Sequence, residues 1–232
     1  MEIVGHRGAA GEAPENTLKA ILRGINCGAK YIEIDVRRTR DGALVLMHDE
    51  TVDRTTNGSG RVSEMTLEEL KKLDAGEGEA VPTLKEALEV VKGKAVLRLE
   101  LKEAGYERHV WQIVSSHGME EEVIFISFLP RALSGIAEAS GGKARLGLIF
   151  YAQPQYWLEV ASRLKVEMVA PHYRLVTADF VRMAKKRLFT VNPWTVNEER
   201  IAEKMMRLDV DLLTTDYPCR MIRFLRQVTP LA

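Results

Sequence analysis

The sequence contains two pairs of charged residues at or near the ends of short apolar runs. In each pair the two residues are two positions apart. Glu33 and Asp35 lie in the run 31–36, and Glu100 and Lys102 lie at the end of the run 96–101. Residues two apart on a β-strand point to the same face, so each pair would share one side of its strand. Converging carboxylates are costly in a protein interior unless a cation or a proton separates them. Glu33, Asp35 and Glu100 therefore predict an oxygen-ligand metal site, suited to Mg²⁺ or Ca²⁺.

Each pair also has a simpler interpretation when it is taken alone. Glu33 and Asp35 fit a solvated strand face, and Glu100 with Lys102 fits an ordinary ion pair. The metal site is favoured because both patterns fall at the ends of strands that we expect to be neighbours.

Two histidines follow other short apolar runs and stand beside charged residues. His6 follows the run 3–5, and His48 follows the run 44–47. An imidazole with an ordinary pKa of about 6.5 can donate or accept a proton near neutral pH. We therefore expect His6 and His48 to act as a general acid and base. A structural role is sufficient for His109 and His117, and no neighbouring motif supports His172.

Two cations stand within the same motifs. Arg7 follows His6, and Lys102 follows the second carboxylate pattern. An arginine can bind two phosphoryl oxygens at once, and a lysine adds a point charge. A metal ion with these two side chains supplies the positive charge that a phosphoryl-transfer transition state needs. The combination indicates phosphodiester hydrolysis.

Residues later in the chain are candidates for the substrate pocket. Trp194 follows the run 188–192 and would wall the pocket; packing at the top of the barrel is the alternative. Asp216 fits a helix N-cap or an orienting partner better than a catalyst. Four further aromatic residues could line an apolar pocket, although aromatic residues at such positions more often cover the barrel: Phe128, Tyr151, Tyr156 and Trp157.

These residues need a framework that brings several strand ends together. Short apolar runs alternate with helical patterns, which is typical of β/α units with a parallel sheet. The expected strands are 3–5, 31–36, 96–101, 123–128, 145–150, 168–171, 188–192 and 211–215; the expected helices are 16–27, 84–92, 106–117, 131–139, 155–164, 178–186, 198–207 and 218–226. Without a Gly-x-Gly-x-x-Gly turn, this alternation favours a (β/α)8 TIM barrel over an open α/β sheet. Active sites of such barrels lie at the carboxyl ends of the strands.

The segment 49–82 interrupts the alternation and is too long for an ordinary β/α connection. We interpret it as a short insertion, between the second strand and the second helix, in one domain that spans residues 1–232. The run 44–47 precedes it as a further strand, and residues 66–73 predict a helix within it. Capping boxes are expected at Thr66 with Glu69 and at Thr83 with Glu86.

Composition excludes several classes of function. The 33 basic and 33 acidic residues give a formal net charge of +0, which provides no electrostatic footprint for nucleic acid or an anionic membrane. No stretch approaches the roughly 20 apolar residues that span a bilayer, and the amino-terminal residues lack the pattern of a secretion signal. Cys27 and Cys219 are the only cysteines, which argues against a disulfide framework and for a reducing compartment. We expect a soluble cytoplasmic enzyme that acts on a small molecule.

Taken together, the motifs resemble those of the glycerophosphodiester phosphodiesterase family. They stand in the family's order and span nearly the whole chain: His6-Arg7-Gly8, Glu15-Asn16-Thr17, Glu33-x-Asp35, His48-Asp49, Glu100-x-Lys102, Trp194-Thr195-Val196-Asn197 and Thr215-Asp216-Tyr217-Pro218. Residues 53–60 also resemble that family's insertion after the second strand. One such motif is weak, whereas seven in order are specific.

The resemblance implies a metal-dependent barrel enzyme that converts a glycerophosphodiester to sn-glycerol 3-phosphate and an alcohol. Matched by motif position, the metal ligands are Glu33, Asp35 and Glu100, the acid–base pair is His6 and His48, and the phosphate contacts are Arg7 and Lys102. In the route that we hypothesise, the 2-hydroxyl of the substrate attacks phosphorus, and water then opens the cyclic phosphate. Direct attack by water is the alternative, and either histidine fits the role of the first base.

Two other functions share parts of this pattern. A lysophospholipase-D-like or sphingomyelinase-D-like phosphodiesterase would use the same barrel and site, and Tyr151, Tyr156 and Trp157 are the aromatic residues that would favour it. A barrel that only binds a phosphorylated ligand is the alternative outside enzymes. Loss of a histidine or carboxylate would favour that alternative, and none is lost.

Overall fold

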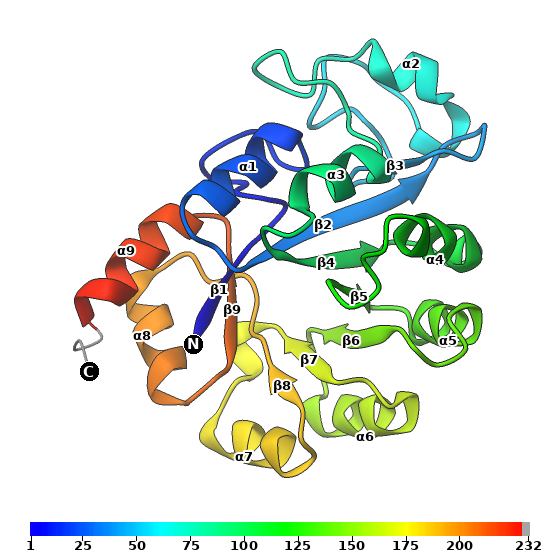
Figure 1. Ribbon diagram of the computed structural model, residues 1–232. Helices are drawn as coiled ribbons and strands as arrows, with labels where there is room; N and C mark the ends of the chain where they lie inside the picture. Colours follow the sequence, from blue (N-terminus) through cyan, green and yellow to red (C-terminus); the bar gives the residue numbers. More distant parts are fainter. Residues whose placement is uncertain (229–232) are drawn as a thin grey trace.

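The structure is a computed structural model, and it describes residues 1–228. Eight parallel strands form the centre of the fold, with helices outside them (Figure 1). The strands are β1 (Glu2–Gly5), β2 (Tyr31–Arg38), β4 (Val96–Leu101), β5 (Val123–Ser127), β6 (Arg145–Phe150), β7 (Met168–Pro171), β8 (Thr190–Val191) and β9 (Leu212–Thr215). They follow the order β8-β7-β6-β5-β4-β2-β1-β9. The first strand in the sequence, β1, therefore pairs with the last, β9.

Backbone hydrogen bonds bridge β8 and β9, the two ends of this order. The Asp211 N–H donates to the Val191 carbonyl at 3.1 Å, and the Thr214 N–H donates to the Pro193 carbonyl at 3.0 Å. These bonds bring the two edges together, so the sheet forms a nearly closed barrel. The predicted TIM-barrel fold is therefore confirmed.

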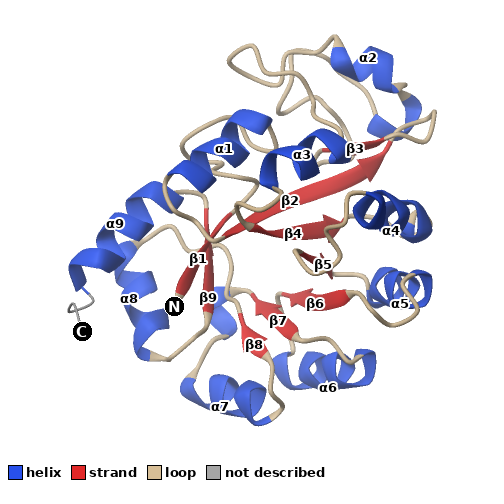
Figure 2. Ribbon diagram, in the orientation of Figure 1, coloured by secondary structure: helices blue, strands red, loops and turns tan. Residues whose placement is uncertain are grey.

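Helices follow the strands around the outside of the barrel (Figure 2). They are α1 (Leu18–Asn26), α3 (Leu84–Val91), α4 (Glu107–Ser116), α5 (Pro130–Ala139), α6 (Pro154–Leu164), α7 (Ala178–Lys186), α8 (Glu199–Arg207) and α9 (Pro218–Val228). The side chain of Thr83 accepts a hydrogen bond from the Glu86 N–H, and the Glu86 carboxylate accepts one from the Thr83 N–H. This capping box fixes the start of α3, as predicted.

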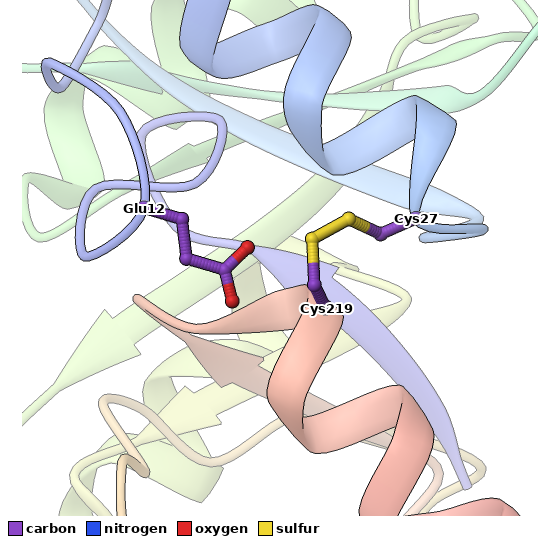
Figure 3. A group of neighbouring side chains, drawn as sticks. All are labelled: Glu12, Cys27 and Cys219. Atoms are coloured by element: carbon purple, nitrogen blue, oxygen red, sulfur yellow. A yellow bond between two sulfur atoms is a disulfide. The ribbon is translucent and has the colours of Figure 1, made fainter.

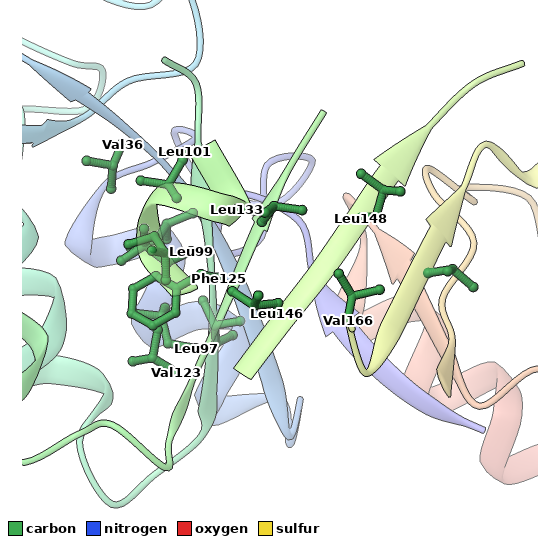
Figure 4. Close-up of a cluster of buried hydrophobic side chains, with 14 of the residues drawn as sticks. Val36, Leu97, Leu99, Leu101, Val123, Phe125, Leu133, Leu146, Leu148 and Val166 are labelled. Carbon is green, nitrogen blue, oxygen red and sulfur yellow. The ribbon is translucent and has the colours of Figure 1, made fainter. Parts of the chain in front are cut away.

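Successive side chains of a barrel strand point alternately toward the surrounding helices and into the barrel interior. On β4, the side chains of Leu97, Leu99 and Leu101 join the cluster between strands and helices, part of which is shown in Figure 4. Arg98 and Glu100 stand at the intervening positions and line the cavity inside the barrel. Because successive side chains point to opposite faces, packing of the leucines under the helices directs the charged residues inward.

A smaller apolar cluster lies inside the barrel. Its buried members are Val4, Ile124, Ile126, Ile149, Met168, Ala170 and Leu212. Most of them come from β5, β6 and β7, the strands that lie away from the carboxylate-bearing β2. The barrel interior is thus apolar on one side and charged on the other.

The long connection after β2 contains β3 (Leu44–Leu46), the 3-10 helix η1 (Val62–Glu64) and α2 (Leu67–Lys71). β3 pairs with β2 in the antiparallel direction, and the rest of the segment lies beside the carboxyl end of β2 (Figure 1). This segment has its own buried residues: Val45, Met47, Val52, Val62, Leu70, Ala75 and Val81. The Thr66–Glu69 capping box is present, and α2 ends at Lys71, two residues before the predicted end.

β8 is shorter than the run 188–192 predicts. Leu188 adopts a positive φ of 63° and is 90% exposed, so it belongs to the turn after α7. At the other end, the Asn192 side chain turns into the barrel and donates a hydrogen bond to Thr214 Oγ1 at 2.8 Å. The run 188–192 therefore contains a turn residue, Leu188, and a polar residue of the barrel interior, Asn192, in addition to the short strand.

The prediction of two separate thiols is wrong, because Cys27 and Cys219 form a disulfide with a Cα–Cα distance of 5.0 Å. The two cysteines are 192 residues apart, and they meet because ring closure places α9 beside α1 (Figure 1). The expectation of a reducing compartment rested on unpaired cysteines and loses that support. In residues 1–228, none of the helices is long and apolar enough to cross a membrane.

We predict that replacing both Cys27 and Cys219 with serine lowers the free energy of unfolding by about 3–5 kcal/mol. A cross-link that closes so long a loop removes conformational freedom from the unfolded chain. Chemical denaturation with and without a reducing agent would measure the effect. Reductant should destabilise the wild type and leave the double variant unchanged; equal stability of oxidised and reduced wild type would contradict the prediction.

Candidate active site

The three carboxylates that the sequence analysis grouped come together at the mouth of the barrel. Glu33 and Asp35 lie on β2, and Glu100 lies opposite Asp35 on the neighbouring β4. All three are buried, and one carboxylate oxygen of each lies within 4.8 Å of the others. Oxygen atoms at this spacing from three side chains can share one cation.

Crowding and burial change the pKa values of these groups in different directions. Burial, reinforced by the charge of Asp35, raises the pKa of Glu33 and raises that of Glu100 to about 7. Burial also acts to raise the pKa of Asp35, but the nearby Lys102 and Arg7 cations outweigh it and lower that pKa. Asp35 is therefore the carboxylate that the local cations keep ionised.

Asp35 is also held in place by Asn16, from the segment that precedes α1. The Asn16 side-chain amide donates to Asp35 Oδ2 at 2.8 Å, and the Asp35 N–H donates to Asn16 Oδ1 at 3.1 Å. Asn16 is buried and adopts a positive φ of 55°. A short amide side chain tolerates this backbone conformation, so the residue can fix both the backbone and the carboxylate of Asp35.

His6 lies at the end of β1 and faces the carboxylates. Its Nδ1 is 2.6 Å from Asp216 Oδ1, and its Nε2 is 3.9 Å from Glu33 Oε2. Burial acts to lower the pKa of His6, but the hydrogen bond to Asp216 and the charge of Glu33 raise it. Asn197 donates to the other Asp216 oxygen at 2.5 Å. Asp216 is thus an orienting partner of His6.

His48 stands two residues after β3 and lines the same cavity as His6. Its Nδ1 is 2.6 Å from Asp49 Oδ1, and Arg54 Nε donates to Asp49 Oδ2 at 2.7 Å. Burial lowers the pKa of His48, and the cations of Lys102 and Arg7 add to this effect. The two histidines therefore differ: the environment favours the charged form of His6 and the neutral form of His48.

The backbone of His48 is anchored by Arg37, which the sequence analysis did not select. Arg37 Nε and Nη2 donate to the His48 carbonyl at 3.0 and 2.9 Å, and Nη1 donates to Glu103 at 2.7 Å. Arg37 stands two positions after Asp35 on β2, so the same alternation that indicated Glu33 and Asp35 extends to it.

Arg7 and Lys102 both contact the carboxylates. Arg7 Nη1 donates to Glu15 at 2.7 Å, and its Nε is 3.5 Å from Asp35. Lys102 Nζ is 2.7 Å from Glu100 and 3.3 Å from Asp35. The predicted phosphate-binding residues are therefore at the site, where they balance carboxylate charge.

The turn that carries His6 and Arg7 depends on a glycine. Arg7 and Gly8 have positive φ values of 48° and 86°. A Cβ atom on Gly8 would lie 2.5 Å from the backbone carbon of Ala20 in α1, closer than real Cβ atoms come. Gly8 thus permits both the left-handed backbone and the close approach of α1. In this turn the Arg7 N–H donates to Glu33 Oε2 at 2.8 Å.

A cavity of about 180 Å³ opens between the charged and apolar halves of the barrel. His6, Arg7, Glu33, His48 and Glu100 line its charged side, and Ile126, Phe128, Ile149, Ala170 and Trp194 line its apolar side. The Trp194 indole donates to the Ala170 carbonyl at 2.8 Å, and its ring meets Phe128 edge-on at 5.5 Å. Trp194 and Phe128 therefore wall the cavity.

The other candidates lie away from this cavity. Trp157 stacks on Phe150 beneath α6, and the exposed Tyr156 packs against Trp157. Tyr151 is 71% exposed and contacts the rim residue Phe128. The remaining histidines make local contacts or line other surfaces: His117 with the Ile113 carbonyl, His172 with Arg174 and Trp194, and His109 in a groove beside α4.

Arg98 is a charged residue of the cavity that the sequence analysis missed. Its side chain is buried, and Nη1 donates to Asn192 and, at 2.9 Å, to Thr214 across the barrel. Burial lowers its pKa to about 10. Arg98 and Glu100 on β4 and Lys102 directly after it stand at every second position. This spacing could have indicated that Arg98 faces the barrel interior with Glu100.

A model of the glycerophosphoryl diester phosphodiesterase family matches residues 6–220. The chain is 36% identical to a glycerophosphodiester phosphodiesterase of Caldanaerobacter subterraneus subsp. tengcongensis, over 97% of this chain and 98% of the relative.

Two solved structures show the same fold. An Oleispira antarctica phosphodiesterase, in complex with the product sn-glycerol-3-phosphate, has a TM-score of 0.89, 31% identity and 97% coverage of both chains. A glycerophosphodiester phosphodiesterase from Agrobacterium tumefaciens has a TM-score of 0.86 and 29% identity, over 96% of this chain and 99% of that chain.

We predict that Asp216→Asn lowers the pKa of His6. The variant keeps the burial that disfavours the imidazolium but removes the anionic partner that raises the pKa of His6. Titration of the histidine ring signals by NMR, in metal-free protein, would measure the shift. Asp179→Asn, at an exposed position of α7, should leave the His6 signal unchanged. An unchanged or higher His6 pKa in Asp216→Asn would refute the assignment of Asp216 as its electrostatic partner.

Proposed function

The chain belongs to the glycerophosphoryl diester phosphodiesterase family, and we propose that it hydrolyses glycerophosphodiesters to sn-glycerol 3-phosphate and an alcohol, with a divalent metal ion and two histidines. Members of this family are phosphoric diester hydrolases. The observation that carries the proposal is the convergence of Glu33, Asp35 and Glu100. Two of these carboxylates, Glu33 and Glu100, line one cavity together with His6 and His48. The product bound to the Oleispira antarctica relative supports the choice of substrate class.

The three carboxylates fit a hard divalent cation, Mg²⁺ or Ca²⁺. Their donors are all oxygen atoms, which these ions prefer over nitrogen or sulfur. Glu33 Oε1 is buried without a hydrogen-bond partner among the described residues. Burial and the charge of Asp35 raise the pKa values of Glu33 and Glu100, so a bound cation would lower the cost of ionising them. A bound cation would supply Lewis-acid stabilisation of negative charge on the phosphoryl group.

The two cations take a second role when the carboxylates hold a metal. Lys102 and Arg7 now contact Asp35, and Lys102 also contacts Glu100. With a divalent ion held by the same carboxylate oxygens, the Arg7 and Lys102 side chains would be available to phosphoryl oxygens. A guanidinium and an ammonium placed at one edge of the cavity would hold the phosphate group there.

The different environments of the histidines support different roles. His6, whose pKa is raised by Asp216 and Glu33 against the effect of burial, is suited to protonate the departing alcohol. His48, whose pKa is lowered by burial, is suited to accept the proton of the attacking hydroxyl. In the cyclic-phosphate route the attacking hydroxyl is the 2-hydroxyl of glycerol, and the histidines exchange roles when water opens the ring.

The apolar half of the cavity receives the part of the substrate that carries no charge. Phe128 and Trp194 form the wall opposite Glu33 and Glu100. Trp194 is fixed by its hydrogen bond to the Ala170 carbonyl, so the wall is rigid where the substrate would contact it. Contacts of this kind orient the substrate and leave the charged groups to act on the phosphate.

We predict that the metal-free protein binds Mg²⁺ or Ca²⁺ about tenfold more weakly at pH 6 than at pH 8. The pKa of Glu100 is raised to about 7, so protons compete with the metal as the pH falls through that value. Isothermal titration calorimetry at both pH values would measure the change. Glu100→Gln should bind more weakly at pH 8 and lose most of the pH dependence. Affinity independent of pH in the wild type would contradict this site.

We predict that His6→Ala and His48→Ala each reduce kcat by about 10²- to 10⁴-fold, because each removes one proton-transfer step. Release of sn-glycerol 3-phosphate from glycerophosphocholine, with Mg²⁺, Ca²⁺ or EDTA, is the assay. His109→Ala, far from the cavity, is the matched control and should retain full activity.

The same assay separates the routes and the substrate classes. A 2-deoxy analogue should resist cleavage by the cyclic route, and equal cleavage would favour direct attack by water. Lysophosphatidylcholine tests the lysophospholipase-D-like alternative. Absence of metal-dependent sn-glycerol 3-phosphate release from every glycerophosphodiester tested would overturn the proposed function.

A further inference from the structure

The Cys27–Cys219 disulfide lies in a solvent-open surface cavity, away from the active-site cavity. This cavity has a volume of about 410 Å³ and is lined by both cysteines together with Arg23, Ile222, Arg223, Arg226 and Gln227. The sulfur atoms join the end of α1 to the start of α9 (Figure 3). Both cysteines are partly exposed, so the disulfide is within reach of a small molecule.

The cavity is positively charged. Arg23, Arg223 and Arg226 are exposed side chains on its walls. Within residues 1–228, neither Arg223 nor Arg226 forms an ion pair, whereas Arg23 lies 3.5 Å from Glu12. Unpaired guanidinium groups beside a cavity attract anions and stabilise a thiolate that forms there.

Glu12 is the acidic group that faces the disulfide (Figure 3). Its Oε1 accepts the Arg220 N–H at 3.2 Å, and its Oε2, which has no hydrogen-bond partner among the described residues, forms an ion pair with Arg23 Nε at 3.5 Å. Glu12 does not line the arginine-walled cavity. An anionic reagent would therefore approach the sulfur atoms from the side of Arg223 and Arg226.

The two sulfur atoms occupy opposite kinds of helix end. Cys219 is the second residue of the eleven-residue α9, where the positive end of the helix dipole stabilises a thiolate. Cys27 is the C-cap of α1, where the dipole has the opposite sign and disfavours a thiolate. In thiol–disulfide exchange, the sulfur that better carries negative charge leaves, and the other sulfur is attacked.

We propose that this disulfide is an exchange site for small anionic thiols, with attack directed to Cys27. A thiolate of the reagent forms a bond to Cys27 Sγ, the Cys27–Cys219 bond breaks, and its electron pair leaves on Cys219 Sγ. A second reagent thiolate then attacks the mixed disulfide, releases the oxidised reagent and leaves Cys27 as a thiolate. Two thiols are oxidised to one disulfide, and the protein disulfide is reduced to two thiols.

The test follows reduction of the native protein by three thiols of different charge: glutathione, which is anionic, 2-mercaptoethanol, which is neutral, and cysteamine, which is cationic. Rates are corrected for the thiolate fraction of each reagent. Glutathione should react faster than cysteamine. Combined Arg223→Gln and Arg226→Gln should slow the glutathione reaction roughly five- to tenfold, and 0.5 M salt should reduce this difference. Combined Arg131→Gln and Arg163→Gln, at exposed positions on α5 and α6, is the charge-matched control.

Trapping and mass spectrometry identify the attacked sulfur. Brief exposure to glutathione followed by alkylation should give the glutathione adduct on Cys27 and the alkyl group on Cys219. The reverse distribution, equal rates for the three thiols, or free thiols in the protein as purified under air would overturn the proposal. None of these readouts depends on phosphodiesterase activity, so they remain informative if the proposed function fails.

Discussion

The architecture of this protein depends on keeping three carboxylates together inside a barrel. A buried charge costs several kcal/mol unless other charges or hydrogen bonds compensate it. Here one oxygen atom from each of three carboxylates lies within 4.8 Å of the other two. Two of the compensating cations, Arg7 and Lys102, form direct contacts, whereas Arg98 acts through space from deeper in the barrel. A divalent ion bound by these carboxylates would add positive charge beside Arg7 and Lys102. The site would then attract a phosphodiester anion more strongly, which couples metal binding to substrate binding.

Strand alternation turns this electrostatic requirement into a geometry. Leucines at every second position of β4 pack under the helices and leave the intervening positions to face the barrel interior. The same rule places the charged residues of β2 beside those of β4 because the two strands pair in register. Residues that must approach one another within hydrogen-bonding distance are thus carried on the most rigid part of the fold. The histidines lie on the segments that follow β1 and β3, and each depends on a neighbouring aspartate to hold its ring.

The sequence predicted most of the fold, because helix and strand patterns are local. The barrel strands and helices fall within a few residues of their expected bounds, and β8 is the exception because its apolar run contains Leu188 in a turn. The sequence also indicated which residues meet at the site, since alternation and strand order suffice for that. The Cys27–Cys219 pairing was missed because it depends on ring closure over 192 residues. Arg98 was missed because an arginine inside a barrel contradicts the usual exposure of charged residues, and only its cross-barrel partners explain it.

The pairing of β1 with β9 has a consequence for how the enzyme is made. His6 is synthesised 210 residues before its partner Asp216, and the two meet only when β9 docks beside β1. Contacts so distant in sequence form late, because closing a long loop is entropically costly. A nascent chain that already displays His6, both β2 carboxylates and His48 therefore still lacks the aspartate that orients one of its two histidines. Synthesis itself thus delays completion of the site until β9 and Asp216 have been added to the chain.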